Sequence, residues 1–144
     1  MLRVLILLLV LSFNAIACDT AKKEGLRIFV SFSMPKELLA SLDQQSKQVG
    51  AKLVIRGLKN NSFKETFEFA KSIDGQGIRI DIDPKAFDEF EVTQVPAFVL
   101  NQNNQYDKIV GNVSIVYALN EFVNKGDLKD KAKEYLRRLE NENK

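Results

Sequence analysis

The feature that most constrains the fold is an alternation, between residues 26 and 82, of short apolar runs with longer amphipathic segments. The segments have apolar residues at helical spacing. Because parallel strands are joined by long crossovers that usually contain a helix, this alternation predicts an α/β sheet with parallel pairing. Three runs rich in Ile, Val, Leu and Phe have the composition of buried strands: Leu26–Phe32, Leu53–Ile55 and Ile78–Ile82.

The first amphipathic segment has clear helix boundaries. Ser33 is expected to cap a helix that runs to about Val49, because a serine hydroxyl can accept a free backbone N–H at a helix start. Pro35 then lies in the first turn, where its missing N–H costs nothing, and Gly50 is a natural stop.

The second amphipathic segment is expected to form a helix from Ser62 to Ile73. Ser62 and Glu65 have the spacing of a capping box, in which each side chain satisfies a backbone N–H group of the other residue. Gly75 and Gly77 interrupt the helix before the third strand. The expected buried face comprises three residues: Phe63, Phe67 and Ala70.

The second half of the chain predicts a hairpin and two further helices. After a loop that carries Phe87 and Phe90, two apolar runs flank the polar turn 101–105 and are expected to pair antiparallel; they are Val95–Leu100 and Asp107–Val110. Ser114 can cap a helix through about Val123. A last, mostly charged helix is expected from near Asp127, with a narrow apolar stripe: Leu128, Tyr135, Leu136 and Leu139.

This order of elements is that of thioredoxin-like proteins. The expected fold class is therefore α/β, a thioredoxin-like three-layer fold whose central mixed sheet of about five strands is flanked by helices. The domain is expected to cover residues 26–126. Residues 18–25 are expected to be a flexible lead-in, and residues 127–144 a C-terminal amphipathic helix.

The N-terminus has the three parts of an export signal. Arg3 supplies the positive charge, the apolar run Val4–Phe13 follows, and Ala15-Ile16-Ala17 matches a cleavage site. The apolar run is shorter than the roughly 20 residues that span a bilayer. Residues 1–17 are therefore expected to be a signal peptide that directs the chain out of the cytoplasm, with no transmembrane segment after its removal.

Cys18 is the only cysteine of the chain, so an intramolecular disulfide is impossible. It directly follows the expected cleavage site. Two interpretations stay open, an incidental cysteine or the lipid-accepting cysteine of a bacterial lipoprotein. The second usually requires a larger aliphatic residue three positions upstream, where this chain has Ala15.

Composition excludes several classes of function. The chain has no histidine, which removes the commonest general base and the commonest metal ligand. With 21 Lys and Arg against 19 Asp and Glu, it offers no electrostatic reason to bind nucleic acid directly. No cofactor is expected, and no metal site either, because the spacing of the acidic residues between Asp81 and Glu89 does not match a calcium-binding loop.

Two motifs occupy the positions of the redox site in thioredoxin-like proteins. Ser33-Met34-Pro35-Lys36 stands where the Cys-x-Pro-Cys motif would stand, and neither Ser33 nor Lys36 can form or resolve a mixed disulfide. The Ser-x-x-Lys spacing also occurs in penicillin-interacting enzymes, but their partner motifs are missing. Thiol-disulfide chemistry and any catalytic residue are therefore expected to be absent.

Val95-Pro96-Ala97 corresponds to the cis-proline loop of the same proteins. An X-Pro bond is the one place where a cis peptide bond costs little, although most such bonds are trans. If the bond is cis, the backbone of Val95 is expected to face an extended peptide beside Met34, a mode of binding that needs no cysteine.

Five short blocks in the right order make the chain similar to the TrbC family of F-type conjugative pilus assembly proteins, over about residues 27–126. They are Phe29-Val30-Ser31-Phe32-Ser33-Met34-Pro35, Ile55-Arg56-Gly57-Leu58, Ile82-Asp83-Pro84, Val95-Pro96-Ala97-Phe98-Val99 and Gly111-Asn112-Val113-Ser114. The resemblance implies a periplasmic component of an F-type type IV secretion system that helps to assemble the pilus and transfer DNA. It also implies partners among the other assembly proteins, such as TraW.

The leading hypothesis is a non-catalytic scaffold that works by protein–protein binding. The alternative is a periplasmic thiol-disulfide or chaperone-like protein that handles peptides. Arg56 and Asn112 are polar residues expected at an interface. The complete expected binding set is Ser33, Met34, Pro35, Val95, Pro96, Arg56 and Asn112.

Overall fold

The computed structural model describes residues 23–75 and 77–142. The expected signal peptide and Cys18 lie outside the described residues. The strands are β1 (Gly25–Phe29), β2 (Lys52–Ile55), β3 (Ile80–Ile82), β4 (Ala97–Gln102) and β5 (Gln105–Val110). The helices are α1 (Lys36–Val49), α2 (Phe63–Asp74), α3 (Pro84–Glu89), α4 (Ile115–Lys125) and α5 (Lys129–Glu142), and a short 3₁₀ helix, η1 (Lys59–Asn61), precedes α2.

The five strands form one mixed sheet in the order β3-β2-β1-β4-β5. β1 is central and pairs parallel with β2, which pairs parallel with β3. On its other side β1 pairs antiparallel with β4, so that Ile28 lies opposite Phe98, and β4 pairs antiparallel with β5. The predicted parallel crossovers and the predicted antiparallel hairpin are both confirmed.

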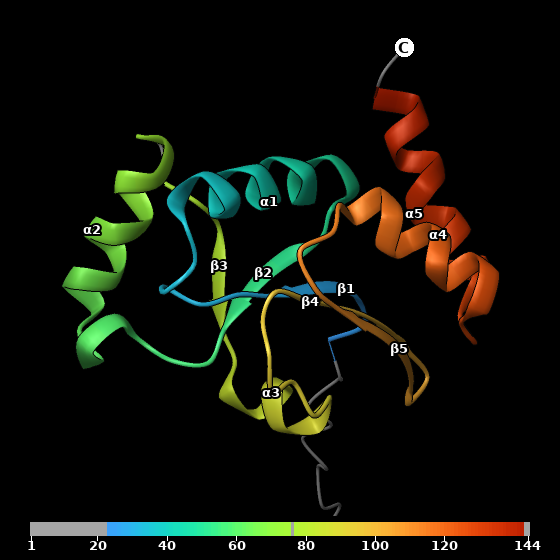
Figure 1. Cartoon of the computed structure of the whole chain (residues 1–144), viewed down its shortest axis with the longest axis horizontal. Helices are drawn as coiled ribbons and strands as arrows, with labels where there is room; N and C mark the ends of the chain where they lie inside the picture. The colour runs from blue at the N-terminus through green and yellow to red at the C-terminus, as the bar shows by residue number, and fades with distance from the viewer. Residues whose placement is uncertain (1–22, 76, 143–144) are drawn as a thin grey trace, which may run out of the picture.

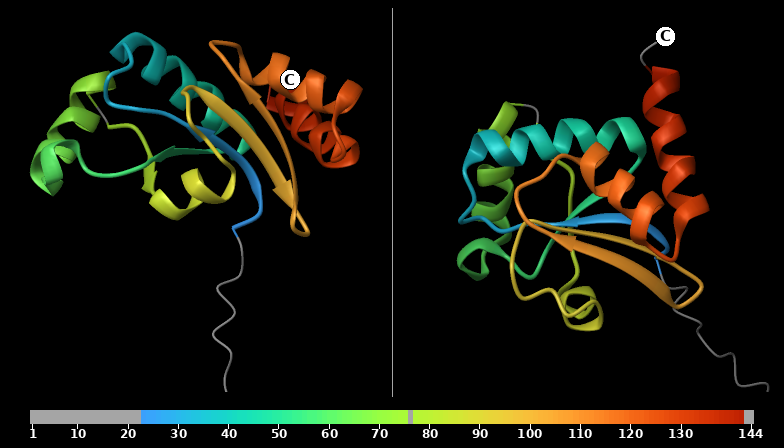
Figure 2. Two further views of the ribbon diagram at one scale, coloured as in Figure 1. Left: turned by 60° about the horizontal axis from the view of Figure 1, so that its bottom comes forward. Right: turned by 45° about the vertical axis from the view of Figure 1, so that its right-hand side comes forward.

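Helices cover the two faces of the sheet unequally (Figure 1). α1, α4 and α5 lie over one face, and α3 lies over the other (Figure 2). Side chains alternate across each strand, so Ile28 and Leu53 join the larger core under α1 and α4, whereas Phe29 and Val54 join a smaller core with α3. α2 lies at the β3 side of the sheet, next to the N-terminal half of α1.

The N-terminal boundary of the sheet differs from the expected one. β1 begins at Gly25 and not after it. The two preceding residues are fixed to the hairpin, because the Asn101 side-chain amide donates to the Lys23 carbonyl (3.2 Å) and the Asn103 backbone N–H donates to the Glu24 carboxylate (2.9 Å). β1 ends at Phe29, and residues 30–35 form a loop instead of extending the strand to Phe32.

The predicted buried face of α2 is confirmed at Ala70, which packs against the larger core, and is wrong at Phe63 and Phe67. Phe63 and Phe67 are 76% and 61% exposed, and Phe69 and Ile73 face the larger core instead. The reason is a contact with a distant residue, since the Phe69 ring packs edge-on against Phe32 at 5.2 Å. The helix start is confirmed, because the Ser62 hydroxyl accepts the Glu65 N–H at 3.2 Å.

The loop predicted after β3 contains the short helix α3. The Asp83 carboxylate accepts the Ala86 N–H at 3.0 Å, and Pro84 occupies the first helical position. Phe87 of α3 and Phe90, which directly follows this helix, pack their rings against Phe29, with centroids 4.8 Å and 6.1 Å away.

Candidate functional site

A loop at the end of β1 shapes one side of the candidate site. The Ser31 carbonyl accepts the Met34 N–H (3.1 Å), and the Ser31 N–H donates to the Met34 sulfur (3.4 Å). The Ser33 hydroxyl lies 2.9 Å from the Ser31 hydroxyl. Ser33 is therefore not the N-cap of α1, contrary to the prediction. Pro35 takes that position without a side-chain cap, because the hydroxyl of Ser33 is turned back to the loop.

A pocket of about 230 Å³ lies where this loop meets the end of β2 and the segment that contains Val95. We call it the sheet-end pocket. It lies at the carboxyl ends of the central strands β1 and β2, next to α3, and side chains from both cores reach it. Its lining residues are Val30, Ser31, Phe32, Ile55, Arg56, Gly57, Phe87 and Val95.

Arg56 provides the positive charge of the sheet-end pocket. Its guanidinium lies over the Phe87 ring, 5.0 Å from the centroid, and donates to the Val92 carbonyl at 3.3 Å. It also forms an ion pair with Asp88 at 3.4 Å. These contacts keep the guanidinium at the mouth of the pocket although 59% of the side chain is exposed.

Val95 forms the opposite wall. The Val95–Pro96 peptide bond is cis, which is one of the two states considered from the sequence. Pro96 is buried, and its carbonyl accepts the Gly111 N–H at 2.9 Å. Val95 itself is half-buried against the smaller core. In the described part of the chain, no hydrogen bond engages the backbone N–H or C=O of Val95.

The structure brings together only part of the predicted binding set. Arg56 and Val95 line the sheet-end pocket. Met34 is half-buried and packs against the larger core, so it anchors the loop and does not line the pocket. Ser33, Pro35 and Asn112 are exposed but do not line the pocket. Asn112 nevertheless directly follows Gly111, whose backbone N–H donates a hydrogen bond to the Pro96 carbonyl.

Six lining residues are not in the predicted binding set: Val30, Ser31, Phe32, Ile55, Gly57 and Phe87. Phe32 was placed in a strand, and Phe87 in a loop. The motif Asp83-Pro84 was an available signal, because aspartate followed by proline favours a helix start and hence a defined position for Phe87. Gly57 follows the last residue of β2 by two positions and lines the pocket beside Arg56.

The acidic residues near β3 are engaged by cations and backbone groups. Asp81 lies 3.6 Å from Lys23 and 3.4 Å from Lys52, and Asp83 lies 3.6 Å from Arg27 in addition to capping α3. Among the residues that the structure describes, no three His, Cys, Asp or Glu side chains gather as metal ligands would. The charged group that lines the sheet-end pocket is the guanidinium of Arg56, and most of the other lining side chains are apolar.

One carboxylate and one ammonium group with shifted pKa values lie far along the chain from the pocket. Hydrogen bonds from Lys131 and Arg138 lower the pKa of Glu134 on α5. A hydrogen bond to Glu121 raises the pKa of Lys125 on α4. Both are exposed pairs within one helix, a common arrangement on solvated helix faces. Within residues 23–142, apart from residue 76, no helix combines the length and apolarity needed to cross a bilayer.

Comparison with known proteins gives two matches. The sequence profile described as "Type-F conjugative transfer system pilin assembly protein" matches residues 28–122. The chain is also 33% identical over 120 residues to the "Periplasmic protein TrbC" of Escherichia coli (strain K12), which covers 82% of this chain and 57% of that protein. The chain thus spans just over half the length of this relative. No solved structure matches the chain.

Proposed function

Because the chain belongs to the family of type-F conjugative transfer system pilin assembly proteins, we propose that it is a non-catalytic assembly component that acts by binding other proteins. The membership confirms the resemblance found in the sequence. The chain is periplasmic, as its Escherichia coli relative is named. In this proposal it is needed for pilus assembly and for DNA transfer, and its partners are other periplasmic assembly proteins such as TraW.

The sheet-end pocket is the observation that carries the proposal. It joins an apolar cavity to a backbone segment at Val95 that has free hydrogen-bonding groups. An extended partner segment can pair with such a backbone and place one apolar side chain in the cavity, as in strand addition. A cavity of about 230 Å³ is smaller than most small-molecule sites, which favours a side chain of a protein as its occupant.

The fold itself supports binding without redox chemistry. We assign the chain to the thioredoxin-like fold, on the strand order, the hairpin next to β1 and the positions of residues 33–36 and Pro96. Ser33 and Lys36 stand where a dithiol would be required, so the thiol-disulfide alternative lacks both sulfurs. The purified chain should not reduce insulin, and measurable turnover in that assay would contradict a non-catalytic role.

A donor-cell assay tests the function. The chain is deleted from a donor that carries its transfer system and is then restored as wild type or as Val95→Asp. We expect Val95→Asp to reduce pilus number and transfer frequency by at least roughly tenfold, because a carboxylate in an apolar pocket loses its hydration.

The matched control is Val116→Asp. Val116 is 46% exposed on α4 and does not line the pocket, so this variant should restore transfer fully. Thermal melting of both variants checks that each is folded. Wild-type transfer by Val95→Asp would place the interface elsewhere, for example on the charged face of α5.

A further inference from the structure

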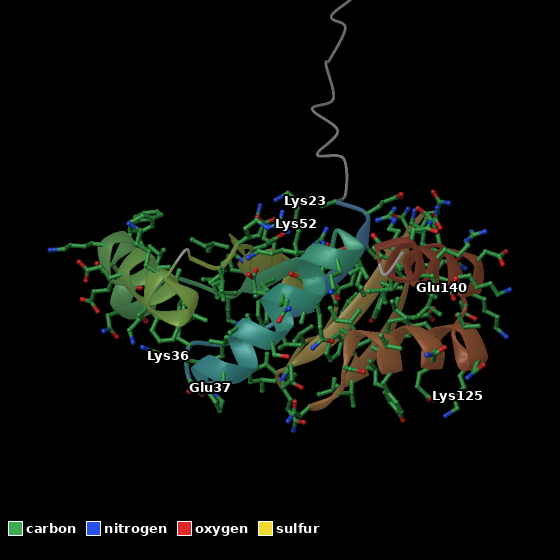
Figure 3. The ribbon with its side chains drawn as sticks, turned by 90° about the horizontal axis from the view of Figure 1, so that it is seen from above. Lys23, Lys36, Glu37, Lys52, Lys125 and Glu140 are labelled. Carbon is green, nitrogen blue, oxygen red and sulfur yellow. The ribbon has the colours of Figure 1, made fainter. Side chains whose placement is uncertain are left out.

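A second group of side chains lies directly beside the sheet-end pocket. Phe32, which lines the pocket, packs edge-on against Phe69 of α2. Two ammonium groups lie near the same Phe69 ring, with Nζ atoms 4.9 Å (Lys59) and 5.6 Å (Lys36) from its centroid. Lys36 opens α1, and Figure 3 shows it on the side of the molecule where α2 lies. We call Lys36 and Lys59 the lysine pair.

The lysine pair lacks the partners that other lysines of the domain have. In the described residues, neither Lys36 nor Lys59 lies within ion-pair distance of a carboxylate, whereas Lys47, Lys52 and Lys125 do. The nearby Glu65 carboxylate accepts from the Asn60 side-chain amide at 2.7 Å. Because both Nζ atoms lie near the same ring, an anion close to this ring is attracted by both positive charges.

The pocket and the lysine pair are continuous. Phe32 belongs to both, and Lys59 follows Gly57, a lining residue, by two positions. Two residues of chain extend at most about 7 Å. A segment with one side chain in the pocket therefore passes the lysine pair within a few residues.

We propose that the partner segment bound at the sheet-end pocket is acidic next to its apolar anchor, and that its carboxylate is bound by Lys36 and Lys59. This inference rests on the proposed function and adds the chemistry of the partner. The pair supplies two mobile point charges rather than the planar fork of an arginine. The lysine pair therefore selects a negatively charged partner segment without requiring one fixed binding geometry. Arg56 is already paired with Asp88, whereas among the described residues no carboxylate forms an ion pair with Lys36 or Lys59.

The test uses two synthetic nine-residue probe peptides with the same Val-Leu-Val centre, one flanked by glutamates and the other by glutamines. Binding to the whole exported chain is followed by NMR titration at low and at physiological salt. We expect the glutamate peptide to bind roughly tenfold more tightly at low salt, the effect of two ion pairs. Added salt should reduce the difference.

Charge reversal tests whether Lys36 and Lys59 bind the acidic residues of the peptide. The double variant Lys36→Glu, Lys59→Glu should lose the preference for the glutamate peptide and keep the affinity for the glutamine peptide. Lys64→Glu is the control, because Lys64 is 84% exposed on α2 and carries the same charge. An equal loss in Lys64→Glu, or no preference in the wild type, would overturn the inference.

Two further measurements separate this inference from the proposed function. Val95→Asp should abolish binding of both peptides, whereas the lysine variants should affect only the acidic one. If the lysine pair has no role but Val95→Asp still blocks transfer, the proposed function stands and the inference fails. Vesicles of phosphatidylglycerol test whether the lysine pair binds a lipid surface instead. Binding to the vesicles that depends on the lysine pair would contradict a protein partner.

Discussion

At the scale of single residues, two buried polar groups attach the C-terminal helix to the sheet. The Asp107 carboxylate, on β5, accepts the N–H groups of Asp127 and Leu128, both at 2.8 Å. The Tyr135 hydroxyl accepts the Leu26 N–H at 3.0 Å. Each group satisfies backbone donors that would otherwise be buried without a partner, which is costly.

The first residue-scale prediction concerns Asp107. Asp107→Ala should lower the free energy of unfolding by about 2 kcal/mol, because the start of α5 loses a charged acceptor for two N–H groups. Urea unfolding followed by circular dichroism measures it. Asp130→Ala is the control, since Asp130 is fully exposed in the first turn of α5 and its ion pair with Lys133 is a surface pair. Similar losses in both variants would show that Asp107 is not a cap.

A second prediction concerns Tyr135. Tyr135→Phe keeps the ring and its contact with Arg138 (4.5 Å to the centroid) but leaves the Leu26 N–H without an acceptor. We expect a loss of about 1–2 kcal/mol in unfolding free energy. Tyr117→Phe, at a residue that is 50% exposed, should change stability by less than about 0.5 kcal/mol. A neutral Tyr135→Phe would mean that water replaces the hydroxyl.

At the scale of elements, α2 shows where a periodic pattern is ambiguous. The segment carries phenylalanines at 63, 67 and 69, so two overlapping stripes have helical spacing. Which stripe is buried depends on Phe32, a residue of another element that contacts Phe69. Periodicity alone contains no information on that contact, and the prediction was wrong at Phe63 and Phe67 for this reason.

The corrected face of α2 gives a prediction. The double variant Phe63→Ser, Phe67→Ser should change unfolding free energy by less than about 1 kcal/mol, because both rings are mostly in water already. Phe69→Ala should cost about 2 kcal/mol or more, since it removes a ring that packs on the larger core. Denaturant titration of the two variants decides between the faces. A greater loss in the double serine variant would restore the original assignment.

The accuracy of the sequence predictions follows from how local each feature is. The strand order along the chain and the cap at Ser114, whose hydroxyl accepts the Tyr117 N–H at 3.1 Å, depend on short patterns and are confirmed. The candidate site depends more on contacts between residues that are far apart in the sequence. Arg56 and Val95 meet because two strand ends and a loop converge, whereas the orientation of Ser33 is set by its neighbour Ser31. No periodic pattern encodes that last kind of contact.

At the scale of the whole molecule, the direction of β1 separates the N-terminal attachment from the pocket. The strand starts at Gly25, beside residues that are bonded to the hairpin, and ends next to Val30, which lines the pocket. Five residues of strand cover about 17 Å. The chain therefore enters the sheet at one end of β1, the blue strand in Figure 1, and the sheet-end pocket lies at the other end of this strand.

From this polarity we expect the pocket to bind in the same way whether Cys18 is incidental or accepts a lipid. We expect Cys18→Ser to bind the glutamate probe peptide within twofold of the wild type, because Cys18 precedes β1 by seven residues at the end remote from the pocket. The mass of the exported N-terminus identifies any lipid, and fractionation shows whether the variant leaves the membrane. A large change in affinity would mean that the N-terminal segment reaches the pocket, which the direction of β1 argues against.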